Sequence, residues 1–122
     1  MDKQALLPVL PELIAQGCDP DIEWYEDPQR ADARVYRGHG GVRESFERWF
    51  EQWDEYGMEA ERFIDHGDDV LVVAREHGRG ARSGATASSR IFIVLTFRDR
   101  KLLRYREFYD EAAALEAVGL SE

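Results

Sequence analysis

A glutamate between two tyrosines near the C-terminus is the residue best placed to do chemistry. Read as a β-strand, residues 101–110 place Leu103, Tyr105, Glu107 and Tyr109 on one face. A carboxyl group in an apolar hollow has its charged form disfavoured and its pKa raised, which suits proton transfer near neutral pH. The alternative is a surface glutamate paired with an arginine or lysine. On the first interpretation Glu107 is a catalytic acid or base, and Tyr105 or Tyr109 hydrogen-bonds an oxyanion that develops on a carbonyl-bearing substrate.

The elements that hold this strand belong to one small acidic domain. The 122 residues fit a single domain over 1–122, large enough for a core and one internal pocket. The chain has 16 Lys and Arg against 25 Asp and Glu, a net charge of −9. Nucleic acids and anionic membranes need clustered positive charge, so neither is expected as a partner. A small hydrophobic molecule, neutral or weakly charged, is favoured instead.

The same composition gives no indication of a metal, a disulfide or a targeting segment. Cys18 is the single cysteine, and the three histidines lack the i, i+4 spacing of a metal site. No Gly-x-Ser-x-Gly elbow or phosphate loop is present. No apolar run approaches the roughly 20 residues of a membrane span, and the N-terminus lacks a secretory pattern. We therefore expect a cytoplasmic protein without metal or cofactor.

An amphipathic helix is predicted after the glycine-rich segment 38–41. An apolar stripe at helical spacing is formed by Val42, Phe46, Trp49, Phe50 and Trp53. This helix can cover one face of a sheet. Its large aromatics are either core residues or the wall of a ligand pocket, since pocket walls are mostly apolar and aromatic.

Strands dominate the rest of the chain. A first strand is predicted at 22–26, and four more at 58–64, 70–76, 86–98 and from 101 onward. Residues 1–18 contain Pro8 and Pro11, which limit them to a shortened helical segment. This order predicts an α+β fold: a curved, mostly antiparallel sheet forming a cone, with helices on its concave side.

Both faces of the long strand 86–98 are apolar, so both must be covered. Ile91, Ile93 and Leu95 lie on one face, with Phe92 and Val94 on the other. With one helical layer available, we expect the second face to pack in a homodimer, sheet against sheet.

A terminal helix is predicted at 111–118. Asp110 is a good N-cap residue, so a structural role is favoured over a catalytic one. Gly119 suits the left-handed C′ position, which would fold Leu120 back onto Leu115.

The order of elements, with the sequences of residues 19–24, 36–43, 97–99 and 114–120, resembles the SnoaL-like branch of the nuclear transport factor 2-like superfamily. The likeness runs from about Asp19 to Leu120. It implies an α+β cone, a homodimer and a site inside the cone. It also implies kinship with polyketide cyclases, which close a ring by intramolecular aldol condensation without metal or cofactor. The superfamily also contains isomerases, dehydratases, epoxide hydrolases and binding domains, so fold alone assigns no reaction.

Three positions of the chain match functional positions of the cyclases. Their acid/base aspartate falls on Glu107, one methylene longer, while their supporting histidine falls on Ile93 and an asparagine falls on Trp24. The resemblance therefore implies a pocket that is more apolar than that of the cyclases, with a lone carboxylate. Arg100 stands where the family usually has glycine in the last hairpin.

The predicted pocket combines these positions with the apolar stripe. His39 either faces the pocket mouth or stabilises a turn, and Arg75, on one face with His77, could orient a carbonyl if that face is inward. The predicted pocket residues are Trp24, His39, Phe46, Trp49, Phe50, Trp53, Arg75, Ile91, Ile93 and Leu95. Three functions stay open: an acid/base enzyme using Glu107, a non-catalytic binding module for an apolar metabolite, and a structural dimerisation domain with a filled cone.

Overall fold

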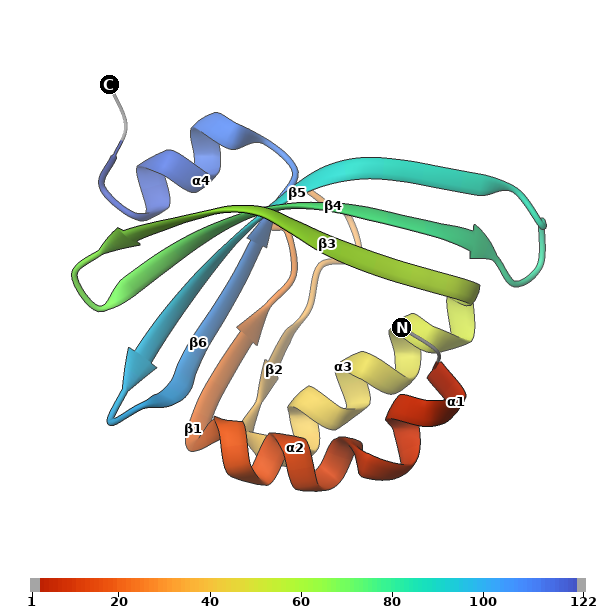
Figure 1. The fold of residues 1–122 in the computed structure, drawn as a ribbon, viewed down its shortest axis with the longest axis horizontal. Helices are drawn as coiled ribbons and strands as arrows, with labels where there is room; N and C mark the ends of the chain where they lie inside the picture. Colours follow the sequence, from red (N-terminus) through yellow and green to blue (C-terminus); the bar gives the residue numbers. More distant parts are fainter. Residues whose placement is uncertain (1–2, 121–122) are drawn as a thin grey trace.

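A computed structural model describes residues 3–120, and it shows one sheet wrapped around a group of helices (Figure 1). The helices are α1 (Lys3–Leu6), the 3-10 turn η1 (Leu7–Val9), α2 (Leu10–Gly17), α3 (Gly38–Gln52) and α4 (Glu111–Ala117). The strands are β1 (Cys18–Tyr25), β2 (Val35–Arg37), β3 (Trp53–His66), β4 (Asp69–Gly80), β5 (Thr86–Arg98) and β6 (Lys101–Phe108). The predicted α+β class and the curved sheet are confirmed. Within the described residues, no helix is both long and apolar enough to cross a membrane.

The six strands form a single sheet in the order β2-β1-β6-β5-β4-β3. All neighbours are antiparallel except β1 and β6, which run parallel. This parallel pair brings the start of the chain beside its last strand, and it places β6 in the middle of the sheet. The strand that carries Glu107 is therefore held on both edges.

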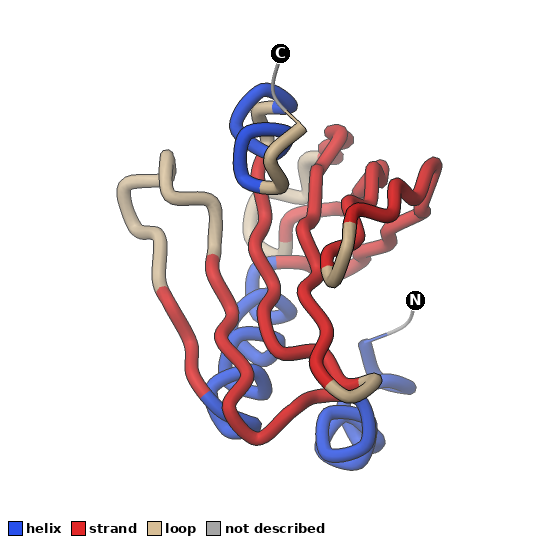
Figure 2. Tube along the Cα trace, turned by 90° about the vertical axis from the view of Figure 1, so that its left-hand side faces the viewer, coloured by secondary structure: helices blue, strands red, loops and turns tan. Residues whose placement is uncertain are grey.

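The N-terminal helices and α3 lie on one side of the sheet, and α4 lies on the other (Figures 1 and 2). Leu10 and Ile14 of α2 pack with Ile22 of β1 and Val42 of α3 in one core cluster. The expectation of helices on the concave side thus holds for the first group, whereas α4 covers the opposite face.

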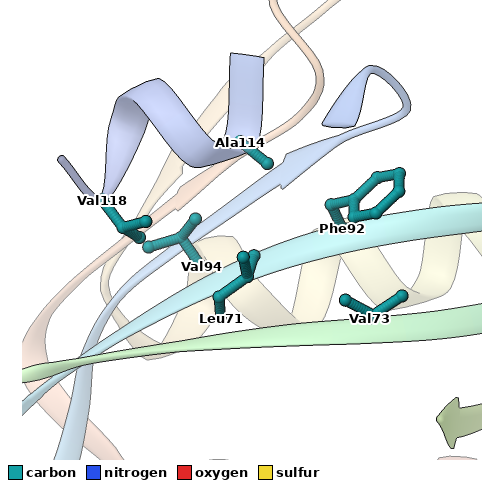
Figure 3. Packing of buried hydrophobic residues seen from close by; sticks show 6 residues of the cluster. All are labelled: Leu71, Val73, Phe92, Val94, Ala114 and Val118. Atoms are coloured by element: carbon teal, nitrogen blue, oxygen red, sulfur yellow. The ribbon is translucent and has the colours of Figure 1, made fainter. Parts of the chain in front are cut away.

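This position of α4 changes the argument for a dimer. Ala114 of α4 and Val118, just after the helix, pack on Phe92 and Val94 of β5 together with Leu71 and Val73 of β4 (Figure 3). The second apolar face of the long strand is therefore covered within the same chain, at least around these residues. The homodimer stays a prediction, but the second apolar face of the long strand no longer argues for it.

Strands β1, β3 and β4 are longer than predicted, α3 ends earlier, and β2 is an additional strand. The aromatic stripe suggested a helix through Trp53, but α3 ends at Gln52 and Trp53 begins β3, paired with Gly80. Pairing with β4 outweighs the helical period here, because tertiary contacts override local propensity. Strand β2 was not predicted, since its three residues are too few to show alternation.

The ends of α4 follow their sequence signals. The Asp110 carboxylate accepts a hydrogen bond from the Ala112 backbone N–H at 3.3 Å. Gly119 has φ of 78°, and the Leu120 N–H donates to the Leu115 carbonyl at 2.8 Å. Both the N-cap and the Schellman arrangement are confirmed, and with them the structural role of Asp110.

The turn between β5 and β6 holds two side chains in the left-handed region. Asp99 has φ of 50° and Arg100 has φ of 68°. Aspartate tolerates this conformation, but arginine does not do so readily, and glycine would adopt it without a Cβ conflict.

We expect Arg100→Gly to raise the free energy of unfolding by about 0.5–1 kcal/mol, because it relieves left-handed strain while adding some unfolded-state entropy. Chemical denaturation would measure the change. Arg100→Ala is the matched control, since it removes the same charge but keeps the Cβ, and it should give no gain. Equal gains from both variants would assign the effect to charge rather than to the backbone.

Candidate active site

A cavity of about 560 Å³ lies between the inner face of the sheet and helices α2 and α3. Its wall is mostly apolar, with side chains from the N-terminal helices, α3 and five of the six strands. A pocket of this size and character suits a small hydrophobic ligand. The cone is therefore not filled by its own side chains, which argues against a purely structural domain.

Most of the predicted site residues meet in this cavity. The lining includes Glu107, Tyr105, Tyr109, Trp24, Phe46, Trp49, Phe50, Ile91 and Ile93. The alternation of β6 brings the first three to one face, as expected. A register shift between Thr96 and Phe97 of β5 then places Leu102 on that face, although strict alternation had assigned Leu103 to it.

Four predicted pocket residues lie outside the lining. The His39 ring Nε2 lies 2.9 Å from the Cys18 carbonyl oxygen and donates to it, so this residue ties the start of α3 to β1. Trp53 begins β3, and its ring lies 5.6 Å from that of Trp49, which does line the cavity. Leu95 packs in the core cluster beside the cavity. Arg75 is exposed on the other face of β4.

Strand register decides the direction of β4, which the sequence left open. Ile93 pairs with Glu107 on one side and with Val72 on the other, so Val72 shares the inner face. Counting by twos along β4 then brings Glu76 inward and turns Arg75 and His77 outward.

Glu76 is the main site residue that the sequence did not indicate. Its side chain is 7% exposed and lines the cavity. The Tyr56 hydroxyl donates to its Oε2 at 2.6 Å, the Tyr109 hydroxyl donates to its Oε1, and the Ser89 hydroxyl lies 3.4 Å from Oε1. These bonds satisfy a buried carboxylate without any cation. The partners come from β3, from β5 and from the residue just beyond β6, so only the assembled sheet reveals them.

Glu107 is perturbed in the direction that acid/base chemistry requires. Burial raises its pKa from 4.5 to about 7, and the negative charges of Glu26 and Glu76 add to that rise. The Tyr105 hydroxyl, 3.1 Å from Oε1, and the Arg30 guanidinium act in the opposite direction. Both protonation states of Glu107 are therefore populated near neutral pH.

The three tyrosines around these acids act as hydrogen-bond donors to them. Burial is the largest cause of the raised pKa of Tyr56, Tyr105 and Tyr109, so all three stay protonated. Tyr105 also stacks on Trp24, with ring centroids 3.7 Å apart and planes at 8°. In this arrangement the Tyr105 and Tyr109 hydroxyls donate to Glu107 and Glu76, so donation to a substrate oxyanion, which stays a prediction, would require these bonds to be exchanged.

Asp27, two residues beyond β1, fixes the position of Tyr109. It is 4% exposed, and its two oxygens accept the Gln29 N–H at 2.9 Å and the Tyr109 N–H at 3.1 Å. The second bond ties the loop after β1 to the chain just beyond β6. Tyr109 is thereby held where its hydroxyl reaches Glu76.

Within the part of the chain that the structure describes, no group of three or more His, Cys, Asp and Glu side chains is arranged to hold a metal ion. The side chains that line the cavity carry carboxyl groups, hydroxyls and the Cys18 thiol among their polar groups.

Comparison with known proteins agrees with this architecture. The model of the SnoaL-like domain family matches residues 11–105, so the chain belongs to that family, and the predicted resemblance is confirmed. No curated protein matches the chain.

Solved structures show the same fold. An NTF2-like protein from Burkholderia thailandensis E264 is 28% identical with a TM-score of 0.73, covering 98% of this chain and 91% of its own. TerC, co-crystallised with polyporic acid, is 25% identical with a TM-score of 0.71, covering 89% of this chain and 85% of its own. A putative SnoaL-like polyketide cyclase from Jannaschia sp. CCS1 is 16% identical with a TM-score of 0.73, covering 98% and 90%.

The raised pKa of Glu107 predicts a pH-dependent effect on stability. The unfolded chain releases this proton near pH 4.5 and the folded chain near 7, so the Glu107 contribution falls as pH rises between these values and stays low above them. Glu107→Gln removes this effect and should stabilise the protein by about 1–3 kcal/mol at pH 8, with little change at pH 4. Denaturation of both proteins at the two pH values measures the difference in their free energies of unfolding. The other carboxylates titrate alike in both proteins, so their effect cancels in this difference. A variant less stable than the parent at pH 8 would contradict the burial of an ionised group.

The anchoring role of Asp27 can be tested separately. Asp27→Asn keeps the size but cannot accept both backbone N–H groups equally well, and we expect a loss of about 1–2 kcal/mol in the free energy of unfolding. Asp32→Asn is the control, because Asp32 is exposed in the same loop and only pairs with Arg30 on the surface. Similar losses of stability from both changes would contradict the anchoring role of Asp27.

Proposed function

We propose that the protein is a cofactor-independent acid/base catalyst acting on a small, hydrophobic, carbonyl-bearing molecule that enters the cavity. The observation that carries this proposal is Glu107, a buried carboxyl group with a pKa of about 7 on the wall of a largely apolar cavity. A group whose pKa lies near the working pH is both a competent base and a competent acid. Relatives described as SnoaL-like polyketide cyclases support the same class of chemistry.

The proposed step is a proton transfer at carbon. Ionised Glu107 removes a proton from the carbon next to the carbonyl, and the C–H electron pair forms the enolate while the carbonyl π pair moves to oxygen. Protonated Glu107 then returns the proton to a carbon or an oxygen of the same molecule, so the enzyme ends unchanged. Tyr105 orients the carboxyl group through its hydrogen bond to Oε1.

Exchange of carbon-bound protons with solvent tests this step without knowledge of the natural substrate. We expect the protein to accelerate exchange of the α-protons of hydrophobic ketones such as 1-tetralone in D₂O, followed by ¹H NMR. Glu107→Gln should lower the acceleration by roughly 10²–10⁴, the usual contribution of a placed general base. Glu51→Gln, an exposed glutamate of α3, should leave it unchanged.

The pH profile of that exchange gives a second check. Because the ionised form acts as the base, the rate should rise with pH and level off above about 7, the pKa of Glu107. Unchanged exchange in Glu107→Gln would refute its assigned role. Tight binding of ketones with no acceleration at any pH would instead favour the binding module, a function that the largely apolar lining also suits.

A further inference from the structure

The charge of the cavity wall is one-sided. Among the described residues that line it are three glutamates, Glu26, Glu76 and Glu107, and no lysine, arginine or histidine. Arg30 acts on Glu107 from outside the lining, and its guanidinium is already shared between Glu26 at 4.0 Å and Asp32 at 3.3 Å. A bound anion would therefore meet negative charge with no compensating cation on the wall.

Hydrogen bonds within the cavity wall add to its preference for cations over anions. Each of the three tyrosine hydroxyls donates its proton to a glutamate, Tyr105 to Glu107 and both Tyr56 and Tyr109 to Glu76. Those protons are not available to a ligand. Around Glu76 the cavity therefore offers chiefly oxygen acceptors, which match a ligand with N–H donors or a positive charge.

The neighbourhood of Glu76 also has the rings that attract a cation. The Tyr56 ring lies 5.6 Å from that of Trp49, edge to face, and 6.5 Å from that of Phe50. All three line the cavity together with Tyr109. The faces of such rings attract ammonium groups, and the attraction grows when water is excluded.

We propose that the ligand of this cavity is a hydrophobic amine whose substituted ammonium group lies beside Glu76, between the rings of Trp49, Phe50, Tyr56 and Tyr109. The proposal rests on the proposed function for the use of the cavity as a binding site, and it adds the substrate class. Glu76 supplies the counter-charge, and its hydroxyl partners hold it in place. The carbonyl-bearing part of the molecule then lies toward Glu107, so the substrate class is that of amino ketones and related cations. Carboxylate and phosphate ligands are excluded by the same charges.

A pair of probes that differ only in charge tests this inference. Benzyltrimethylammonium and neopentylbenzene have the same shape, with a cationic nitrogen in one and a neutral carbon in the other. Binding of each to the intact protein would be measured by chemical-shift changes in ¹H–¹⁵N spectra at pH 7. We expect the cation to bind about tenfold tighter or better than its neutral isostere, and phenylacetate not to bind.

Glu76→Gln isolates the counter-charge. It keeps the shape of the side chain, so it should reduce this preference about tenfold while binding of neopentylbenzene stays unchanged. Glu51→Gln, which removes a charge outside the cavity, should keep the preference. The comparison of the two probes on the parent protein needs no variant, so it decides the matter even if Glu76→Gln fails to fold.

The outcomes separate the two proposals. Equal or tighter binding of neopentylbenzene to the parent protein would overturn the amine inference, while Glu107-dependent exchange of 1-tetralone protons would still stand. A preference for the cation that survives in folded Glu76→Gln would overturn the placement beside Glu76. If no probe and no ketone binds, the cavity is not a binding site and both proposals fail.

Discussion

The central position of β6 in the sheet is the constraint on which the candidate site depends. This strand is bonded to β1 on one edge and β5 on the other, so its side chains have only two directions. One face turns toward the cavity and carries Tyr105 and Glu107, while Arg104 and Arg106 take the other. A strand paired on both edges cannot rotate to bring its glutamate to water. The curl of the sheet then closes an apolar space over that carboxyl group, and burial raises its pKa.

At Glu107 the burial that suits proton transfer also lowers the stability of the folded protein. Keeping a carboxyl group in an apolar cavity is unfavourable at neutral pH, and the rest of the chain compensates through packed clusters on both faces of the sheet. The cluster under α4 matters here because it covers the outer face of β4 and β5, whose inner faces form part of the cavity wall. Proteins commonly hold destabilised groups of this kind at functional sites.

The two buried acids are held differently, and this difference organises the cavity. Glu76 is surrounded by three hydroxyl groups, two from strands β3 and β5 and one from Tyr109 just beyond β6. Glu107 has one tyrosine partner and the negative charges of Glu76 and Glu26 nearby. A fully hydrogen-bonded carboxylate is suited to fixed electrostatic recognition, and a less satisfied one is suited to proton transfer. Asp27 supports the Glu76 arrangement by anchoring the backbone of Tyr109, whose hydroxyl reaches Glu76.

Local signals in the sequence determined most of the elements and one of the two acids. The period of two along residues 101–110 was enough to group Tyr105, Glu107 and Tyr109. The cap residues of α4 cap the helix at the predicted positions. Trp53 shows the limit of such signals, since its helical spacing was overridden by pairing with β4. Glu76, the outward turn of Arg75 and the cover that α4 provides were decided only by tertiary structure. Each depends on which strands are neighbours and on their register. The contacting residues are 13 to 82 positions apart in the sequence, so their local patterns do not indicate the pairing.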